Sequence, residues 1–197
     1  MRLKNLSGRS DQLQGGAGGG AGDGGIPPDA GPPCGALGQP CCATNQCNTG
    51  LMCTRCGCLD SWAEWPMPNP TSPNQQSYDT STAGVVIDNV TGLMWQKNVD
   101  ASSYTVDGAC AYCAGLTLAG HGDWRVPTQI ELVSIVDFSR ASPAIDTGAF
   151  GTGAPTDNFW SATPWNADLT YAWMIYFDLG WGDFRYMTNT NRVRCVR

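Results

Sequence analysis

The distribution of ten cysteines along 197 residues is the feature that most constrains how this chain can fold. Three of them lie far downstream, at Cys110, Cys113 and Cys195. The other seven are Cys34, Cys41, Cys42, Cys47, Cys53, Cys56 and Cys58. Both groups have an odd number of members, so if every cysteine is paired, at least one disulfide must join the two groups. The sequence therefore predicts a small cysteine-rich module linked covalently to a larger domain.

The cysteine content also indicates the compartment. Disulfides persist in oxidising surroundings, so we expect an extracellular protein or a component of the cell envelope. A secretory signal would fit this location, but residues 1–14 contain no apolar core. We therefore expect a start further upstream or a processed product. A cytosolic thiol protein is the alternative.

Charge argues against nucleic-acid binding, and hydropathy argues against a transmembrane segment. The chain has a net charge of −6, and residues 78–197 contain 12 acidic and 7 basic side chains. This lacks the basic excess that nucleic-acid binding needs. No run of 18 apolar residues is present, so no transmembrane segment is predicted.

The seven upstream cysteines lie in a stretch with few apolar residues, 34–60. Crosslinks must then supply its stability, and a knottin-like disulfide module is the preferred interpretation. A zinc site built from Cys53, Cys56 and Cys58 is the rival. The absence of any nearby histidine makes zinc the weaker alternative.

Two stretches have the composition of linkers. Residues 1–33 are rich in glycine and proline, cannot bury a core, and are expected to form a disordered tether. Residues 59–80 are proline-rich but too apolar for a free linker, so we expect them to lie across the following domain, which we start at residue 61. The large apolar side chains of this strip are Trp62, Trp65 and Met67.

The main domain, residues 61–197, mixes strand and helix patterns without a βαβ rhythm, which predicts the α+β class. A β-hairpin is expected at 85–95, with a glycine in its turn. Helices are expected at 106–119, capped by Asp107, and at 129–138. Further strands are predicted at 159–163, 171–178, 183–188 and 192–197, the last with arginines on a polar face and Val193 and Cys195 on a buried one.

The segment Asp123–Leu132 carries the densest local pattern. Pro127 precedes Thr128, and Glu131 follows three residues later, which predicts a capping box at the start of a helix. Asp123 and Arg125 flank Trp124. In an extended strand they would share a face and pair while the indole enters the core, so we assign these residues structural roles.

Seven pieces of sequence, in order, resemble the Lcl C-terminal domain family, over about Trp62 to Arg197. The resemblance implies a fold similar to C-type lectin-like and formylglycine-generating-enzyme-like domains, with twisted antiparallel strands and two helices. The founding member is a secreted bacterial adhesin whose domain binds sulfated polysaccharide and is associated with trimerisation. Its collagen-like stalk has no counterpart here. The pieces are Trp65–Pro70, Asp88–Trp95, Ala111–Cys113 with Leu116, Asp123–Val126 with Pro127, Glu131 and Leu132, Phe159–Ser161, Ala172–Trp173 and Val193–Arg197.

The resemblance also implies a disulfide pairing. Cys113 and Cys195 occupy two family positions that look like partners. Cys110 would then pair with one of the seven module cysteines, although a free buried thiol is the alternative. A redox role for Cys110 and Cys113 is the weaker interpretation, because it would leave Cys195 without a partner.

The sequence offers no catalytic residue. His121 is the single histidine and lies in a Gly-flanked loop, without a placed nucleophile. Neither a phosphate-binding loop nor an EF-hand spacing is present. The sugar-binding signatures of calcium-dependent lectins are missing, so no cofactor is predicted, and calcium binding stays open without support. The cysteine pair of formylglycine-generating enzymes also has no counterpart.

Aromatic side chains are the remaining functional signal. Trp95, Trp124, Trp160 and Trp173 fall in family motifs and are expected in the core. The candidate ligand surface lies in less patterned sequence and consists of Trp165, Tyr171, Trp181, Asp183, Arg185 and Tyr186, next to Phe184. In a strand, Trp181, Asp183 and Arg185 would share one face. The arginines at 185, 192, 194 and 197 are expected to form a local basic strip.

These observations favour a secreted or cell-surface, non-catalytic recognition module that binds a polysaccharide or a surface partner. The first alternative is a structural or protein-interaction component of the envelope, with the cysteine-rich module as the binding element. The second is an enzyme on a formylglycine-generating-type scaffold, whose weakness is the missing nucleophile.

Overall fold

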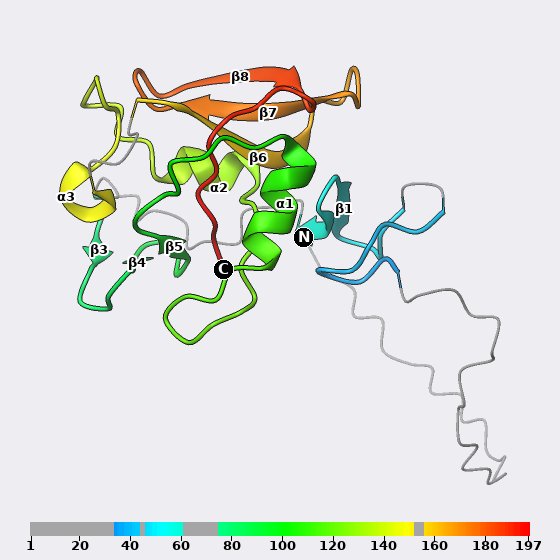
Figure 1. Cartoon of the computed structure of the whole chain (residues 1–197), viewed down its shortest axis with the longest axis horizontal. Helices are drawn as coiled ribbons and strands as arrows, with labels where there is room; N and C mark the ends of the chain where they lie inside the picture. The colour runs from blue at the N-terminus through cyan, green and yellow to red at the C-terminus, as the bar shows by residue number, and fades with distance from the viewer. Residues whose placement is uncertain (1–33, 44–45, 61–74, 152–155) are drawn as a thin grey trace, which may run out of the picture. The chain divides into compact units, whose positions relative to one another are not determined.

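The computed structural model describes residues 34–43, 46–60, 75–151 and 156–197 (Figure 1). Pro33–Arg197 form one compact unit. The predicted tether lies outside the described residues, and so do residues 61–74 of the predicted strip, with Trp62, Trp65 and Met67. The two ends of the strip, residues 59–60 and 75–80, are described and include strand residues. Within them, three helices and eight strands in three small antiparallel sheets confirm the predicted mixture of α and β structure.

The cysteine-rich module is built on a hairpin of β1 (Leu51–Thr54) and β2 (Gly57–Asp60). Its internal disulfides are Cys34–Cys42, Cys41–Cys53 and Cys47–Cys58. The first bridge closes before the third begins, so the three bridges do not all interleave, as the expected knot would require. Gly57 has φ +112°, and a Cβ there would lie 2.7 Å from the carbonyl oxygen of Gln39, which restricts this position to glycine.

The fourth disulfide of the module, Cys56–Cys110, joins the hairpin turn to α1 (Val106–Ala114). An ion pair between Arg55 and Asp107 lies beside it, with N–O distances of 2.6 and 2.9 Å. Leu59 of β2 is buried in the same hydrophobic cluster as α1. The bridge that the odd cysteine counts predict therefore lies within a packed contact.

The second sheet has the order β3 (Tyr78–Asp79), β4 (Val85–Asp88) and β5 (Met94–Gln96). Its β4–β5 hairpin confirms the prediction for residues 85–95. Gly92 has φ +76° in the turn, and the Asp88 carboxylate accepts hydrogen bonds from the Val90 N–H and the Thr91 hydroxyl at 2.9 and 2.8 Å. Glycine and Asx-turn chemistry together fix this reversal.

The helices are shorter than predicted. Helix α1 ends at Ala114 because Gly115 forms its C-cap, and its N-cap is Thr105 rather than Asp107, which instead binds Arg55. Helix α2 (Gln129–Ser134) ends four residues before the predicted limit. A third helix, α3 (Thr147–Phe150), is capped by Asp146 and was not predicted.

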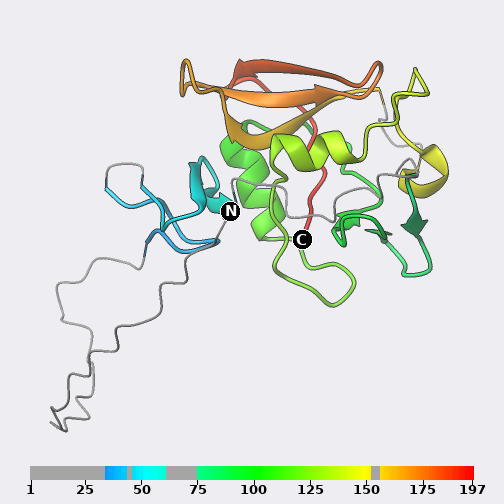
Figure 2. The same cartoon turned by 180° about the vertical axis from the view of Figure 1, so that it is seen from behind.

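The third sheet has the order β6 (Asn158–Pro164), β7 (Tyr171–Tyr176) and β8 (Trp181–Tyr186), so the predicted strand at 183–188 begins and ends two residues earlier. Helices α1 and α2 both contact β6 and lie on the β6 side of the sheet, whereas β8 forms its outer edge (Figures 1 and 2). Two hydrophobic clusters fill the interior, one around Trp160 with α1 and one around Phe159 with α2. The sheet is therefore buried at β6 and exposed at β8.

The predicted strand at 192–197 is wrong. This segment makes isolated bridges, from Arg192 to Phe159 and from Val196 to both Trp95 and Arg125, as it crosses the unit between other elements (Figure 1, red). The bridges reach β6, β5 and Arg125, which lies outside the named elements, so no continuous ladder forms. A disulfide joins Cys195 to Cys113, the pair that the resemblance implied.

Arg194 does not lie on a polar face, because only 2% of it is exposed. Its Nη1 donates to the carbonyls of Gln96 and Lys97, each at 2.7 Å, and its guanidinium lies 5.0 Å from the Phe150 ring and 5.6 Å from the Phe159 ring. Burial lowers the pKa of Arg194 to about 9. The simple alternation of polar and buried positions therefore fails here.

Candidate functional site

Within the segment Asp123–Leu132, the side chains of Arg125, Thr128 and Glu131 bond to one another. Thr128 and Glu131 form the predicted capping box, in which the Glu131 carboxylate accepts from the Thr128 N–H at 2.7 Å. Arg125 donates to both oxygens of Glu131 at 2.8 and 2.6 Å. Burial alone would raise the pKa of Glu131, but Arg125 and Thr128 outweigh it and lower this pKa below its usual value.

The predicted pair of Asp123 with Arg125 is wrong. Asp123 instead accepts from Arg197 at 2.7 and 3.1 Å, and these hydrogen bonds lower its pKa. The backbones of Arg125 and Val196 exchange hydrogen bonds of 2.9 Å, which brings the next residue, Arg197, to Asp123. Each charged side chain of the segment thus has a structural partner.

Three of the four tryptophans expected in the core are buried, namely Trp95, Trp124 and Trp160. The fourth, Trp173, is only half-buried. It lies on β7 opposite Phe184 of β8, and the two rings meet edge to face with centroids 5.7 Å apart. Trp173 therefore belongs to an aromatic group at the sheet surface.

This aromatic cluster consists of Trp165, Tyr171, Trp173, Phe184 and Tyr186. Trp165 stacks on Phe184 with ring centroids 4.1 Å apart and an interplanar angle of 5°. Tyr171 lies opposite Tyr186 across the strands, with centroids 4.0 Å apart. A hydrogen bond with Tyr186 raises the pKa of Tyr171 to about 12. Tyr186 is 51% exposed, so the cluster opens to solvent.

A tight turn before β7 holds Trp165 in the cluster. The Asp168 N–H donates to the Trp165 carbonyl at 3.1 Å, and the Trp165 N–H donates to the Tyr171 carbonyl at 2.9 Å. The Asp168 carboxylate accepts from the N–H and hydroxyl of Thr170, which lowers the pKa of Asp168. This Asx turn positions the Trp165 indole through hydrogen bonds of the backbone and of Asp168, and none of these bonds involves the indole ring.

The structure divides the predicted ligand surface between two faces of the β7–β8 hairpin. Trp181, Asp183 and Arg185 share one face of β8, as the alternation predicted, whereas Phe184 and Tyr186 point to the other. Trp181 is 64% exposed. Only Trp165, Tyr171 and Tyr186 of the six predicted residues come together in the aromatic cluster.

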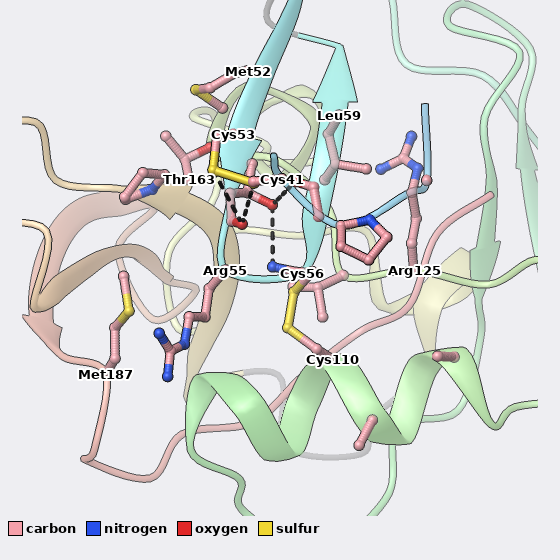
Figure 3. Close-up of a pocket in the computed structure, with 18 of the residues that line it drawn as sticks. Cys41, Met52, Cys53, Arg55, Cys56, Leu59, Cys110, Arg125, Thr163 and Met187 are labelled. Carbon is pink, nitrogen blue, oxygen red and sulfur yellow. Dashed lines mark hydrogen bonds between the residues drawn. A yellow bond between two sulfur atoms is a disulfide. The ribbon is translucent and has the colours of Figure 1, made fainter. Parts of the chain in front are cut away.

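A groove of about 1370 Å³ runs beside the aromatic cluster. Its walls come from the β1–β2 hairpin, α1, residues 122–126 and the start of the β6–β7 connection. Figure 3 shows the hairpin joined to α1 through Cys56 and Cys110, with Thr163 and Met187 on one side and Arg125 on the other. Trp165 and Trp173 line the groove as well as belonging to the cluster, so the two features form one continuous candidate site.

The charged side chains that line the groove are all paired. Arg55 binds Asp107, Arg125 binds Glu131, and Asp123 binds Arg197. Asn166 and Thr163 add uncharged polar groups beside the aromatic wall. Among the described residues, the groove therefore offers apolar surface and neutral hydrogen-bonding groups.

The predicted basic strip does not form. Arg192 pairs with Asp157 at 2.9 Å, Arg197 pairs with Asp123, and Arg194 is buried. Arg185 alone of the four is exposed without an ion-pair partner among the described residues. The arginines near the C-terminus therefore serve mainly to hold the fold together.

The cysteines lie in disulfides, which removes them as candidate metal or redox groups in this state. The sulfurs of Cys41, Cys47 and Cys58 lie within 4.8 Å of one another, but each belongs to a bridge. The three cysteines of the rival zinc site, including Cys53 and Cys56, bind three different partners.

His121, the single histidine of the chain, contacts Trp124 through its backbone. The His121 carbonyl accepts from the Trp124 indole N–H at 3.1 Å.

The described residues thus define a disulfide-stabilised α+β unit with a solvent-exposed aromatic cluster beside a neutral groove. The family model of the Lcl C-terminal domain matches residues 84–197, more than half of the chain, and the chain belongs to this family. Six of the seven resembling pieces lie within that match; Trp65–Pro70 lies outside both the match and the described residues. None of the curated proteins compared with the chain matches it. No helix among the described residues is long and apolar enough to cross a membrane.

Two parts of this site escaped the prediction from sequence. Trp173 was assigned to the core because it lies in a family motif, although its spacing from Tyr171 places both on one face of a strand. The groove has no local sequence signal, because it forms where the cysteine-rich module meets the domain. The odd cysteine counts predicted the contact but not its location.

Proposed function

We propose that this protein is an extracellular, non-catalytic recognition module that binds an uncharged polysaccharide at the aromatic cluster and the adjoining groove. The observation that carries the proposal is the continuity of the two features through Trp165 and Trp173. Aromatic walls with a few polar groups are typical of binding sites for small molecules and short polymer segments.

The ring geometry supports a sugar ligand. Trp165 and Phe184 stack on each other with nearly parallel rings, and Tyr186 keeps about half of its surface in solvent. Tyrosine and tryptophan offer an apolar face with a polar tip, which suits a sugar ring that is apolar on one face and hydroxylated at its rim. Asn166, which lines the groove, supplies an amide for those hydroxyls.

The charge pattern favours an uncharged ligand over a sulfated one. The resemblance implied a sulfated polysaccharide, but the two cations that line the groove, Arg55 and Arg125, are paired with Asp107 and Glu131. The chain as a whole carries a charge of −6. A polyanion would have to break existing ion pairs to gain new ones.

Two further parts of the proposal rest on the fold. Five disulfides that use all ten cysteines favour an oxidising, extracellular location. An antiparallel sheet whose strand β6 contacts both α1 and α2 is compatible with the C-type lectin-like fold that the resemblance implied.

A glycan array followed by titration with a monovalent oligosaccharide tests the function. We expect binding to uncharged glycans, a loss of about tenfold or more in affinity on Tyr186→Ala, and no loss on Trp181→Ala. The second variant is the matched control, because it removes an exposed aromatic ring from the opposite face of the same strand. Failure to bind any uncharged glycan, or equal losses for the two variants, would contradict the proposal.

A further inference from the structure

Among the described residues, no strand pairs with the outer edge of β8. Strand β8 pairs with β7 on one side, and none of the isolated bridges between described residues involves Trp181–Tyr186 (Figures 1 and 2). Its side chains are exposed apart from the half-buried Phe184. Such an edge presents backbone N–H and C=O groups that another strand can use.

The direction of these backbone groups follows from two hydrogen bonds. The Met187 N–H donates to the Thr170 carbonyl at 2.9 Å, so in the register of this hairpin the odd-numbered residues of β8 face β7. The Phe184 N–H instead donates to the Asp183 carboxylate at 2.8 Å, as expected for a group that faces outward. Gly182, Phe184 and Tyr186 therefore offer their backbone groups at the free edge.

This restricts how β8 could pair with itself. An antiparallel pair related by a two-fold axis must place two outward-facing residues opposite each other. An axis between positions 182 and 184 would set Asp183 against Asp183, and an axis between 184 and 186 would set Arg185 against Arg185. An axis at Phe184 instead sets Asp183 against Arg185 twice, and like charges directly opposite are destabilising whereas opposite charges stabilise.

We infer that β8 pairs antiparallel with β8 of a second copy of this chain, with the two-fold axis at Phe184. Asp183 and Arg185 then lie opposite Arg185 and Asp183 of the second copy, as a non-hydrogen-bonded pair in which the side chains are closest. The Asp183 carboxylate then accepts from the guanidinium of Arg185 of the second copy instead of from the Phe184 N–H. This frees the Phe184 N–H, and the backbone groups of Phe184 pair across the axis. The Tyr186 carbonyl already accepts from the Asn189 N–H at 2.9 Å and retains a second lone pair.

The same register accounts for the exposure of Trp181. This indole is 64% exposed and lies on the face of Asp183 and Arg185. Pairing about Phe184 sets it opposite Met187 of the second copy, so that apolar contacts flank the two ion pairs. On the other face the aromatic clusters of the two copies become neighbours. The inference does not depend on the proposed polysaccharide ligand.

The test is the mass of the full chain in solution, measured by sedimentation equilibrium over a wide range of concentration. The wild-type chain is expected to shift from 20.9 kDa to twice that mass. Asp183→Arg and Arg185→Asp each create like-charge pairs and should raise the dissociation constant at least about tenfold. The double variant Asp183→Arg/Arg185→Asp restores opposite charges and should restore the dimer, and the two single variants should assemble when they are mixed.

Each contrary outcome is decisive. A mass of 20.9 kDa at every concentration, or a dimer indifferent to both charge reversals, overturns the inference. Failure of both the double variant and the mixture to assemble overturns it as well. If a single variant does not fold, as judged by circular dichroism, Phe184→Pro replaces it. This change removes an outward N–H that makes no bond to β7. The Phe184→Pro variant should be monomeric, and a dimer contradicts the inference.

Discussion

The segment Asp123–Leu132 and the β7–β8 hairpin use polar and aromatic residues in opposite ways. In the segment, Trp124 is buried, and Arg125, Thr128 and Glu131 bond to one another. In the hairpin, Trp181 and Tyr186 are more than half exposed, and the rings gather at the surface. The comparison teaches that the side chains of the dense motif already serve the fold. The exposed aromatic side chains, which are available to a ligand, lie mainly where the sequence has less pattern.

The largest expected effect on the free energy of unfolding comes from removing the Cys113–Cys195 disulfide, which belongs to the fold that both regions share. Replacing both Cys113 and Cys195 with alanine opens a bridge between residues 82 apart in sequence. In the chain-entropy model this costs about 4–5 kcal/mol in the free energy of unfolding. Denaturant unfolding measures it. A loss below about 1 kcal/mol would show that packing alone holds the C-terminal segment.

The next largest effect belongs to the structural segment. Glu131→Ala leaves Arg125 without its carboxylate and removes half of the capping box, so we expect a loss of about 2–3 kcal/mol in the free energy of unfolding. Glu131→Gln is the matched control. It keeps a capping acceptor and should cost about 1–2 kcal/mol. Equal unfolding midpoints for wild type and Glu131→Ala would remove the structural role.

The pH dependence sharpens the same assignment. The pKa of Glu131 is lowered in the folded state, so its contribution to stability is full above its unfolded pKa and is lost as the pH falls through the folded pKa. The difference in unfolding free energy between wild type and Glu131→Gln should be constant near neutral pH and shrink below about pH 4. A difference that grows on acidification would contradict this sign.

The smallest stability effect is expected in the hairpin. Tyr186→Ala removes a half-exposed ring whose partner is Tyr171, and we expect a loss of at most about 1 kcal/mol in the free energy of unfolding. Thermal unfolding at matched pH measures it. A loss as large as that of Glu131→Ala would make the aromatic cluster a structural element and erase the contrast between the two regions.

Local chemistry was predictable from the sequence, and long-range geometry was not. The capping box of Thr128 and Glu131 and the hairpin with Gly92 depend on neighbours in the chain. The partner of Asp123 was mispredicted because Arg197 lies 74 residues away in sequence and is brought close by a backbone bridge. Arg194 was placed on a polar face because alternation cannot anticipate two carbonyls and two aromatic rings around a buried cation.

The candidate site was predicted only in part for the same reason. The sequence predicted strands close to β7 and β8, which carry most of the aromatic residues, and Trp181, Asp183 and Arg185 share a face of β8 as predicted. Alternation along β8 also separates these three residues from Tyr186, but it could not show that Trp165 and Tyr171 join Tyr186, since this depends on the register of β7 with β8 and on the turn before β7. The groove depends on the Cys56–Cys110 bridge, and odd cysteine counts leave seven candidate partners for Cys110.

The most direct test of the central claim is amide chemical-shift mapping while an uncharged oligosaccharide that the glycan array selects is added to the wild-type chain. The claim is that ligand binds at the aromatic cluster and the adjoining groove, and that the capping box of Thr128 and Glu131 has only a structural role. We predict saturable shifts at Trp165, Trp173 and Tyr186 and their chain neighbours, with Thr128 and Glu131 unchanged. Shifts confined to residues 123–132, or saturable binding that leaves the aromatic cluster unperturbed, would contradict it.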